Sequence, residues 1–188
     1  YAVDAAVAVL VLDDYRKRDK SAREFHQQKL AYIAQQVIRL PVRSEFEKMA
    51  AGPWSADFRD AVGQIAGDRG WFRFAPCKDR KGDLAQPGDA LADGVIWAKD
   101  TLGERASKVA SLLREFRRFG DSGLERWATV LRVAEDLQQA GQPITRPAIQ
   151  QGVDNWPGKR DKKWFSRDDI NRAIDGLVAK AWMEVRGE

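Results

Sequence analysis

A loop near the end of the chain, 158–164, combines side chains that can contact phosphate groups. It contains four basic residues and one acidic one: Lys159, Arg160, Lys162, Lys163 and Asp161. Ammonium and guanidinium groups neutralise phosphate charge, and aromatic rings beside them can stack on bases. The flanking aromatics are Trp156, Trp164 and Phe165. Two interpretations stay open: a nucleic-acid contact, or a solvated loop whose aromatics are core anchors.

The helix expected over 167–180 would extend that contact. Arg167, Asn171 and Arg172 lie on its outer face, where their donors can reach phosphates or base edges. Three acidic residues on or near this face would repel a phosphate backbone: Asp168, Asp169 and Asp175. Folds of this kind also serve as protein contacts, so contact with DNA and contact with a protein remain alternatives.

A second basic cluster lies on the polar side of an earlier helix. It consists of Lys108, Arg114, Arg117 and Arg118. Long basic side chains commonly cover the solvated flank of a helix, and we expect that role here. The cluster gains a functional meaning only if it adjoins the loop that carries Lys159.

The sequence offers no convincing catalytic or metal-binding constellation. His26 is the only histidine, and we expect it to be a partly buried residue with its hydrogen bonds satisfied. We expect Cys77, the single cysteine, to be an inert thiol. Phosphate-cradling glycine loops, nucleophile elbows and metal-binding helix motifs are absent from the sequence. We therefore predict a protein without catalytic residues, metal or cofactor, or a non-catalytic part of a larger enzyme.

Composition excludes several classes of protein. The chain has 188 residues, of which 44% are hydrophobic and 32% charged, as in ordinary globular proteins. No apolar run approaches the roughly 18 residues that span a bilayer, so we expect no membrane partner and a cytoplasmic location. The net charge of +4 is small beside 32 basic and 28 acidic residues, so any basic footprint must be local. The sequence leaves the oligomeric state open.

The first 75 residues predict a helical domain. Val3–Tyr15 has helical spacing and an apolar character that demands burial. Ser21 is a candidate cap for a second helix, which ends at Pro41, and Ser55 is a candidate cap for a third. Trp71–Ala75 is typical of a short strand. The beginning at Tyr1 rather than Met suggests a processed product or a piece of a longer protein.

A change in composition marks the middle of the chain. Proline, glycine and charged residues dominate 76–103 and predict an irregular connector, with a short strand at Val95–Lys99. Amphipathic helices follow over 104–119 and 124–140, and Thr145 caps a shorter one. Ser166 then caps the helix over 167–180, and Trp182–Arg186 has the composition of a strand. From Leu124 the order is long helix, short helix, basic loop, helix and strand, which is that of a winged-helix module.

The segment EFHQQKLAYIAQ, followed by EFEKMAAGPW, resembles a known domain family. Its matching positions are Lys29, Leu30, Tyr32, Gly52 and Pro53. It is similar to the helical antitoxin-like domain of Panacea and SocA-type proteins. The resemblance is closer still to the tail region of some type I restriction-modification methylase and specificity proteins. The stretch from ERWATVLRVAEDL to AWMEV looks like the winged-helix-like end of those tails.

The resemblance implies a context and an alternative function. We expect a mainly α protein: a helical domain over 1–75, an irregular connector over 76–103 and a winged-helix-like domain with short strands over 104–188. The preferred function is a nucleic-acid-binding or complex-assembling module of a prokaryotic restriction-like or phage-defence system. The alternative is an antitoxin-like or adaptor domain, which would bind a protein subunit through Tyr32, Trp54 and Phe58.

Overall fold

The computed structural model describes residues 1–77, 82–159 and 161–187. This part of the chain is mainly helical and has two small antiparallel sheets, so the predicted helical class is confirmed. The chain is divided into two compact units. Unit 1 consists of Tyr1–Phe46 and Ser55–Arg118, and unit 2 consists of Glu47–Trp54 and Phe119–Glu188.

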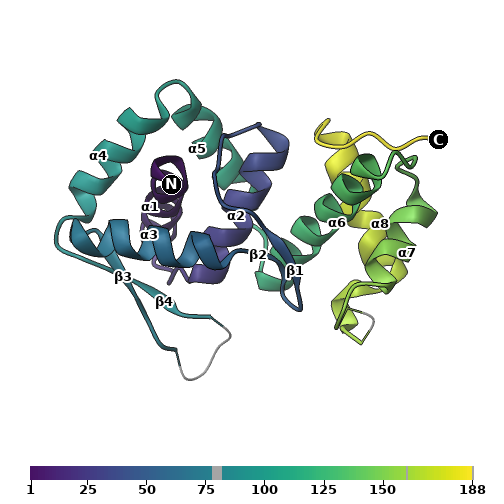
Figure 1. Cartoon of the computed structure of the whole chain (residues 1–188), viewed down its shortest axis with the longest axis horizontal. Helices are drawn as coiled ribbons and strands as arrows, with labels where there is room; N and C mark the ends of the chain where they lie inside the picture. Colours follow the sequence, from purple (N-terminus) through teal and green to yellow (C-terminus); the bar gives the residue numbers. More distant parts are fainter. Residues whose placement is uncertain (78–81, 160, 188) are drawn as a thin grey trace. The chain divides into compact units, whose positions relative to one another are not determined.

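Unit 1 is organised around one central helix. Figure 1 shows α1 end-on, with α2, α3, α4 and α5 placed around it. The helices of this unit are α1 (Ala2–Arg16), α2 (Glu24–Val37), α3 (Ala56–Asp68), α4 (Leu91–Leu102) and α5 (Arg105–Phe116). Every side chain from Ala5 to Leu12 is buried, which confirms the predicted burial of the first helix. A helix that is apolar on all sides is stable only when its whole surface is buried in a core.

One buried carboxylate fixes the start of α1 to the chain that follows α2. The Asp4 side chain is 0% exposed and accepts hydrogen bonds from the backbone amides of Arg43 and Ser44, both at 3.0 Å. The Ser44 hydroxyl donates to the same carboxylate at 2.5 Å. A buried charge is tolerated when its oxygens are hydrogen-bonded in this way.

The start of α2 differs from the prediction. Ser21 does not cap it, because the helix begins at Glu24 with Arg23 at the N-cap. The imidazole Nδ1 of His26 accepts a hydrogen bond from the Arg23 amide at 3.0 Å, and its ring stacks on Tyr15. The expected hydrogen bonding of His26 is confirmed, and the side chain, at 5% exposure, is more deeply buried than the partly buried residue that we expected.

Unit 1 also contains the N-cap of α3 and an antiparallel pair of strands. The Ser55 hydroxyl accepts from the Phe58 amide at 3.2 Å, which confirms the predicted cap of α3. β3 (Phe72–Ala75) pairs antiparallel with β4 (Leu84–Pro87), with Phe72 opposite Pro87. The predicted strand at Trp71–Ala75 is confirmed to within one residue.

The predicted irregular connector over 76–103 is wrong for most of its described part. It contains β4 and all of α4, and the predicted strand at Val95–Lys99 is helical. Gly94, one of the glycines behind that prediction, lies within α4 and allows close packing, since a Cβ there would approach the Trp71 ring to 2.8 Å. Trp71 in turn packs on Trp97, with ring centroids 4.5 Å apart. Close packing, not chain flexibility, accounts for the glycine.

Unit 2 is a set of three helices with a hairpin from an earlier part of the chain. Its elements are α6 (Asp121–Gln139), α7 (Arg146–Asp154), the short 3₁₀ helix η1 (Lys163–Phe165), α8 (Arg167–Ala179), β1 (Glu47–Met49) and β2 (Gly52–Trp54). The strands pair antiparallel with Glu47 opposite Trp54, and β2 packs on α6. The hydroxyls of Thr145 and Ser166 accept backbone hydrogen bonds at the starts of α7 and α8, as predicted.

Two predictions for this part of the chain need correction. Trp182–Arg186 forms no strand, and the Arg186 amide donates to the carbonyl of Ile144. The boundary predicted at residue 104 also differs from the observed units, because α5 buries Val109, Leu112, Leu113 and Phe116 in unit 1. The hairpin over 47–54 belongs by its contacts to unit 2 rather than to the helical domain that precedes it.

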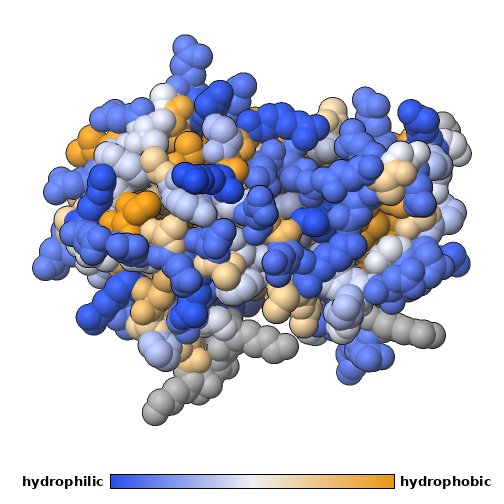
Figure 2. Space-filling model, viewed as in Figure 1, coloured by the Kyte–Doolittle hydropathy of each residue, from blue (hydrophilic) through white to orange (hydrophobic). Residues whose placement is uncertain are grey.

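The visible face of the molecule is largely hydrophilic, with apolar residues in small separate groups (Figure 2). In the described ranges, no helix is long and apolar enough to cross a membrane.

Candidate nucleic-acid interface

The lysine at the centre of the predicted phosphate-binding loop is buried. Lys159 has a side chain that is 0% exposed, and its ammonium group donates to the Glu125 carboxylate of α6 and to the carbonyl of Ala50 at 3.0 Å. It also lies over the rings of Trp156 and Phe165. A buried ammonium with these partners holds the loop in place and contributes no contact to an external phosphate.

Lys162 and Trp156 complete this internal attachment. The Lys162 ammonium donates to Glu125 and to the carbonyl of Ala50 at 2.7 Å, while the Trp156 indole donates to the carbonyl of Met49 at 2.9 Å. Burial, the largest influence, raises the pKa of Glu125, but the charges and hydrogen bonds of the two lysines outweigh it and leave that pKa below its ordinary value. The cluster attaches the tip of the β1–β2 hairpin to the loop before α8.

Sequence reasoning missed Glu125 and the carbonyl of Ala50 as partners of these lysines, and the carbonyl of Met49 as the partner of Trp156. A signal for Glu125 was present, because it lies three and four residues before Ala128 and Thr129, on the buried side of its helix. A carboxylate there requires a cation. Nothing in the sequence indicates that the carbonyl of Ala50 would accept from Lys159, or that of Met49 from Trp156, more than a hundred residues away.

The exposed part of the predicted site surrounds the start of α8. Trp164 is 37% exposed, whereas the neighbouring aromatics Trp156 and Phe165 are buried. Lys163, Arg167 and Arg172 are exposed, and Asn171 is half-buried. We call the group of Lys163, Trp164, Arg167, Asn171 and Arg172 the α8 surface. Arg160, which the sequence analysis also assigned to phosphate contact, lies outside the described residues.

Hydrogen bonds fix the geometry of the α8 surface. The guanidinium of Arg126 donates to the carbonyl of Trp164 at 2.6 Å and lies 3.8 Å from the Asp169 carboxylate. Asp169 also accepts from Arg172 and from the Ser166 hydroxyl. The hydrogen bond from Ser166, followed by the charges of Arg126 and Arg172, holds the pKa of Asp169 below its ordinary value. Asp169 thus neutralises part of the positive charge, while Asp168 and Asp175 remain exposed.

The residues predicted to contact a protein partner are mostly inside the fold. Tyr32 and Phe58 are buried, and both pack near Phe46 in the core of unit 1. Trp54 is half-buried at the end of β2. Side chains enclosed in this way cannot contact another protein while unit 1 is folded, so Tyr32 and Phe58 are wrong as contact residues.

The charges are distributed unevenly between the two units. Unit 2 contains twelve basic and twelve acidic residues in the sequence, and unit 1 contains twenty basic and sixteen acidic residues. The net charge of +4 therefore belongs to unit 1. The second basic cluster is there too: Lys108 and Arg114 are on α5, and Arg117 and Arg118 follow it.

The other reactive side chains form no centre in the part of the chain that the structure describes. Its His, Cys, Asp and Glu residues include no group of three or more that could hold a metal ion. Cys77 is a free, half-buried thiol.

A scan of the sequence against models of known protein families finds no match, and a search of curated proteins finds no significant relative.

Proposed function

We propose that the chain is a non-catalytic nucleic-acid-binding module and that the α8 surface contacts DNA. The observation that carries this proposal is the exposure of Trp164 among the cations Lys163, Arg167 and Arg172. An aromatic ring at the surface can pack on a base or a deoxyribose, and the cations beside it can contact phosphates.

The arrangement of unit 2 supports a winged-helix-like interpretation. α6, α7 and α8 pack on one another, and α8 follows the loop that carries the basic residues. In such modules the last helix enters the major groove with its N-terminal residues near base edges. The β1–β2 hairpin supplies the two-stranded sheet of this unit in place of strands after α8. The resemblance to restriction-modification tails adds a prokaryotic restriction-like or phage-defence system as the proposed context.

The adaptor alternative has less support. Its predicted contact residues Tyr32 and Phe58 are buried. The tip of the β1–β2 hairpin is already bonded to Trp156, Lys159 and Lys162 of the same unit.

Fluorescence anisotropy with a labelled DNA duplex tests the proposal. Trp164→Ala is expected to weaken binding about tenfold or more, since one stacked aromatic contributes about 1–3 kcal/mol. Adding Lys163→Gln and Arg167→Gln to Trp164→Ala is expected to weaken DNA binding further. Val178→Ala is the matched control, because Val178 has the same 37% exposure and lies near the other end of α8. Equal affinities of Trp164→Ala and Val178→Ala would exclude the α8 surface as the contact.

A further inference from the structure

The positive charge of unit 1 is concentrated in two segments. Residues 13–20 and 105–118 together contain nine basic and four acidic side chains, whereas the rest of unit 1 contains eleven basic and twelve acidic ones. The excess of positive charge therefore comes entirely from these segments. We call them the basic surface.

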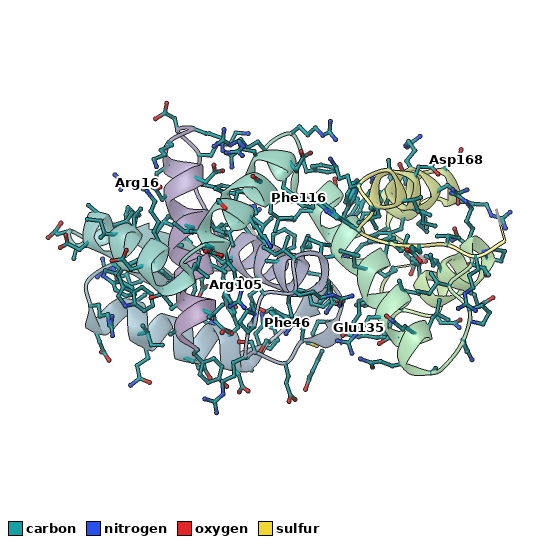
Figure 3. The ribbon with its side chains drawn as sticks, turned by 90° about the horizontal axis from the view of Figure 1, so that it is seen from above. Arg16, Phe46, Arg105, Phe116, Glu135 and Asp168 are labelled. Carbon is teal, nitrogen blue, oxygen red and sulfur yellow. The ribbon has the colours of Figure 1, made fainter. Side chains whose placement is uncertain are left out.

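Direct contacts bring the two segments together. α1 packs on α5, and the guanidinium of Arg117 donates to the Asp14 carboxylate at 2.6 and 3.0 Å. Arg18 pairs with the same carboxylate at 2.9 Å and donates to the carbonyl of Arg117 at 3.4 Å. Figure 3 labels Arg16 and Phe116 near the C-terminal ends of the two helices, which lie on the same side of unit 1. Residues about 100 positions apart thus form one surface.

The acidic residues of this surface do not neutralise it. Asp14 is shared between two guanidinium groups, and Asp13 is paired with Lys17. Arg16 and Lys20 are exposed and have no acidic partner in the described residues. Arg114 is exposed and bonds to the uncharged Ser111 hydroxyl. Several positive charges consequently face solvent.

A structural role explains only part of this charge. Cations in the last turn of a helix interact favourably with its C-terminal carbonyls, which accounts for Arg16 on α1 and Arg114 on α5. It does not account for Lys20, beyond the end of α1, or for Arg105 and Lys108 on the first half of α5.

The composition of the surface favours a nucleic acid over a protein partner. The exposed large apolar side chains of the described residues are Met49, Ile96, Trp164 and Val178, and all lie outside the basic surface. Protein interfaces have an apolar core and few charged residues at the centre. A surface rich in arginine without exposed apolar residues matches the phosphate backbone, which guanidinium groups contact through paired hydrogen bonds.

We propose that the basic surface binds the phosphate backbone of DNA, as a second contact in addition to the α8 surface. This inference rests on the proposed function. Because these contacts are electrostatic and independent of base sequence, the basic surface supplies general affinity, while the α8 surface supplies any reading of the bases.

The test is the salt dependence of duplex binding by three proteins: the whole chain, the triple variant Arg16→Gln, Lys20→Gln and Arg114→Gln, and a control triple variant. The control changes Arg39, Arg73 and Lys99 to Gln, three exposed cations of unit 1 outside the basic surface. The plot of log K against log salt has a negative slope, and loss of three phosphate contacts is expected to make that slope shallower by about 2 to 3. The control is expected to change it by less than about 1.

The outcomes separate this inference from the proposed function. If the unchanged chain binds the duplex and the triple variant has the same slope, this inference fails and the α8 proposal stands. If the unchanged chain does not bind, both fail. Equal binding of labelled polyglutamate would show a surface for acidic polypeptides and would overturn the assignment to DNA. The three side chains are exposed, so the triple variant is expected to stay folded and to lose no more than about 1 kcal/mol for each of Arg16 and Arg114 at its helix end. If the triple variant unfolds, the three single variants test the inference instead. Each is expected to make the negative slope shallower by about 0.9.

Discussion

Lys159 and Glu125 form a buried ion pair between the loop before α8 and the helix α6, and the Lys159 side chain is 0% exposed. The pair explains why a lysine in a basic loop does not reach solvent. Its ammonium also bonds to the hairpin carbonyl of Ala50, so one cation joins three segments of unit 2.

Lys159→Ala is expected to lower the free energy of unfolding by about 3 kcal/mol or more, because it leaves the buried Glu125 carboxylate short of a partner. Lys163→Ala removes an exposed lysine four residues away and is expected to change stability by less than about 0.5 kcal/mol. Urea denaturation of the two variants measures the difference. Similar midpoints for both would contradict a structural role for Lys159.

The stability difference between the unchanged chain and Glu125→Gln is expected to depend on pH. The folded chain holds the pKa of Glu125 below its ordinary value of 4.5. A lowered pKa in the folded state gives stability that is present above the unfolded pKa and is lost as pH falls through the folded pKa. Denaturation at pH 7 and at several values below about 4.5 should show the two proteins converging. If the stability difference between the two proteins does not change with pH, the ion pair of Glu125 is not its source.

Asp4→Ala is expected to destabilise unit 1 by about 3 kcal/mol, since it leaves the buried amide of Ser44 and that of Arg43 without their acceptor. Ser44→Ala removes only the hydroxyl donor and is expected to cost about 1 kcal/mol. Thermal unfolding of both variants shows which of the two changes destabilises the chain more. A larger effect from Ser44→Ala would show that the carboxylate is not the central acceptor.

Gly176→Ala tests the packing of α8 on α6. A Cβ at Gly176 would lie 2.4 Å from the Trp127 ring, which is itself packed against Phe119 and Trp182. We expect a loss of about 1–3 kcal/mol from overpacking. Gly67→Ala meets no atom within 4 Å inside α3 and should stabilise the chain by about 0.5–1 kcal/mol. A gain in stability from Gly176→Ala would contradict the observed packing.

The local elements could largely be predicted from the sequence, because their signals are local. The apolar run of α1 and the caps at Ser55, Thr145 and Ser166 each depend on residues within one or two turns. The failures have non-local causes. Gly94 looks like a helix breaker until Trp71 is seen to pack against it.

The candidate site was predicted in part. Its location around the start of α8 could be derived from the basic loop, but the sequence does not distinguish an exposed lysine from one enclosed by distant groups. Lys159 and Lys163 look equivalent in the sequence, and only contacts with Glu125 and with the carbonyl of Ala50 separate them. The pairing of Arg117 with Asp14, which builds the basic surface, likewise joins residues about 100 positions apart.

The most direct test of the proposed DNA binding is the affinity of the whole chain for a labelled duplex at about 50 mM and about 200 mM salt. A protein that makes several phosphate contacts is expected to bind at the lower concentration and to lose at least about a hundredfold in affinity at the higher one. Absence of binding at low salt, or an affinity that salt does not change, would contradict the proposed function.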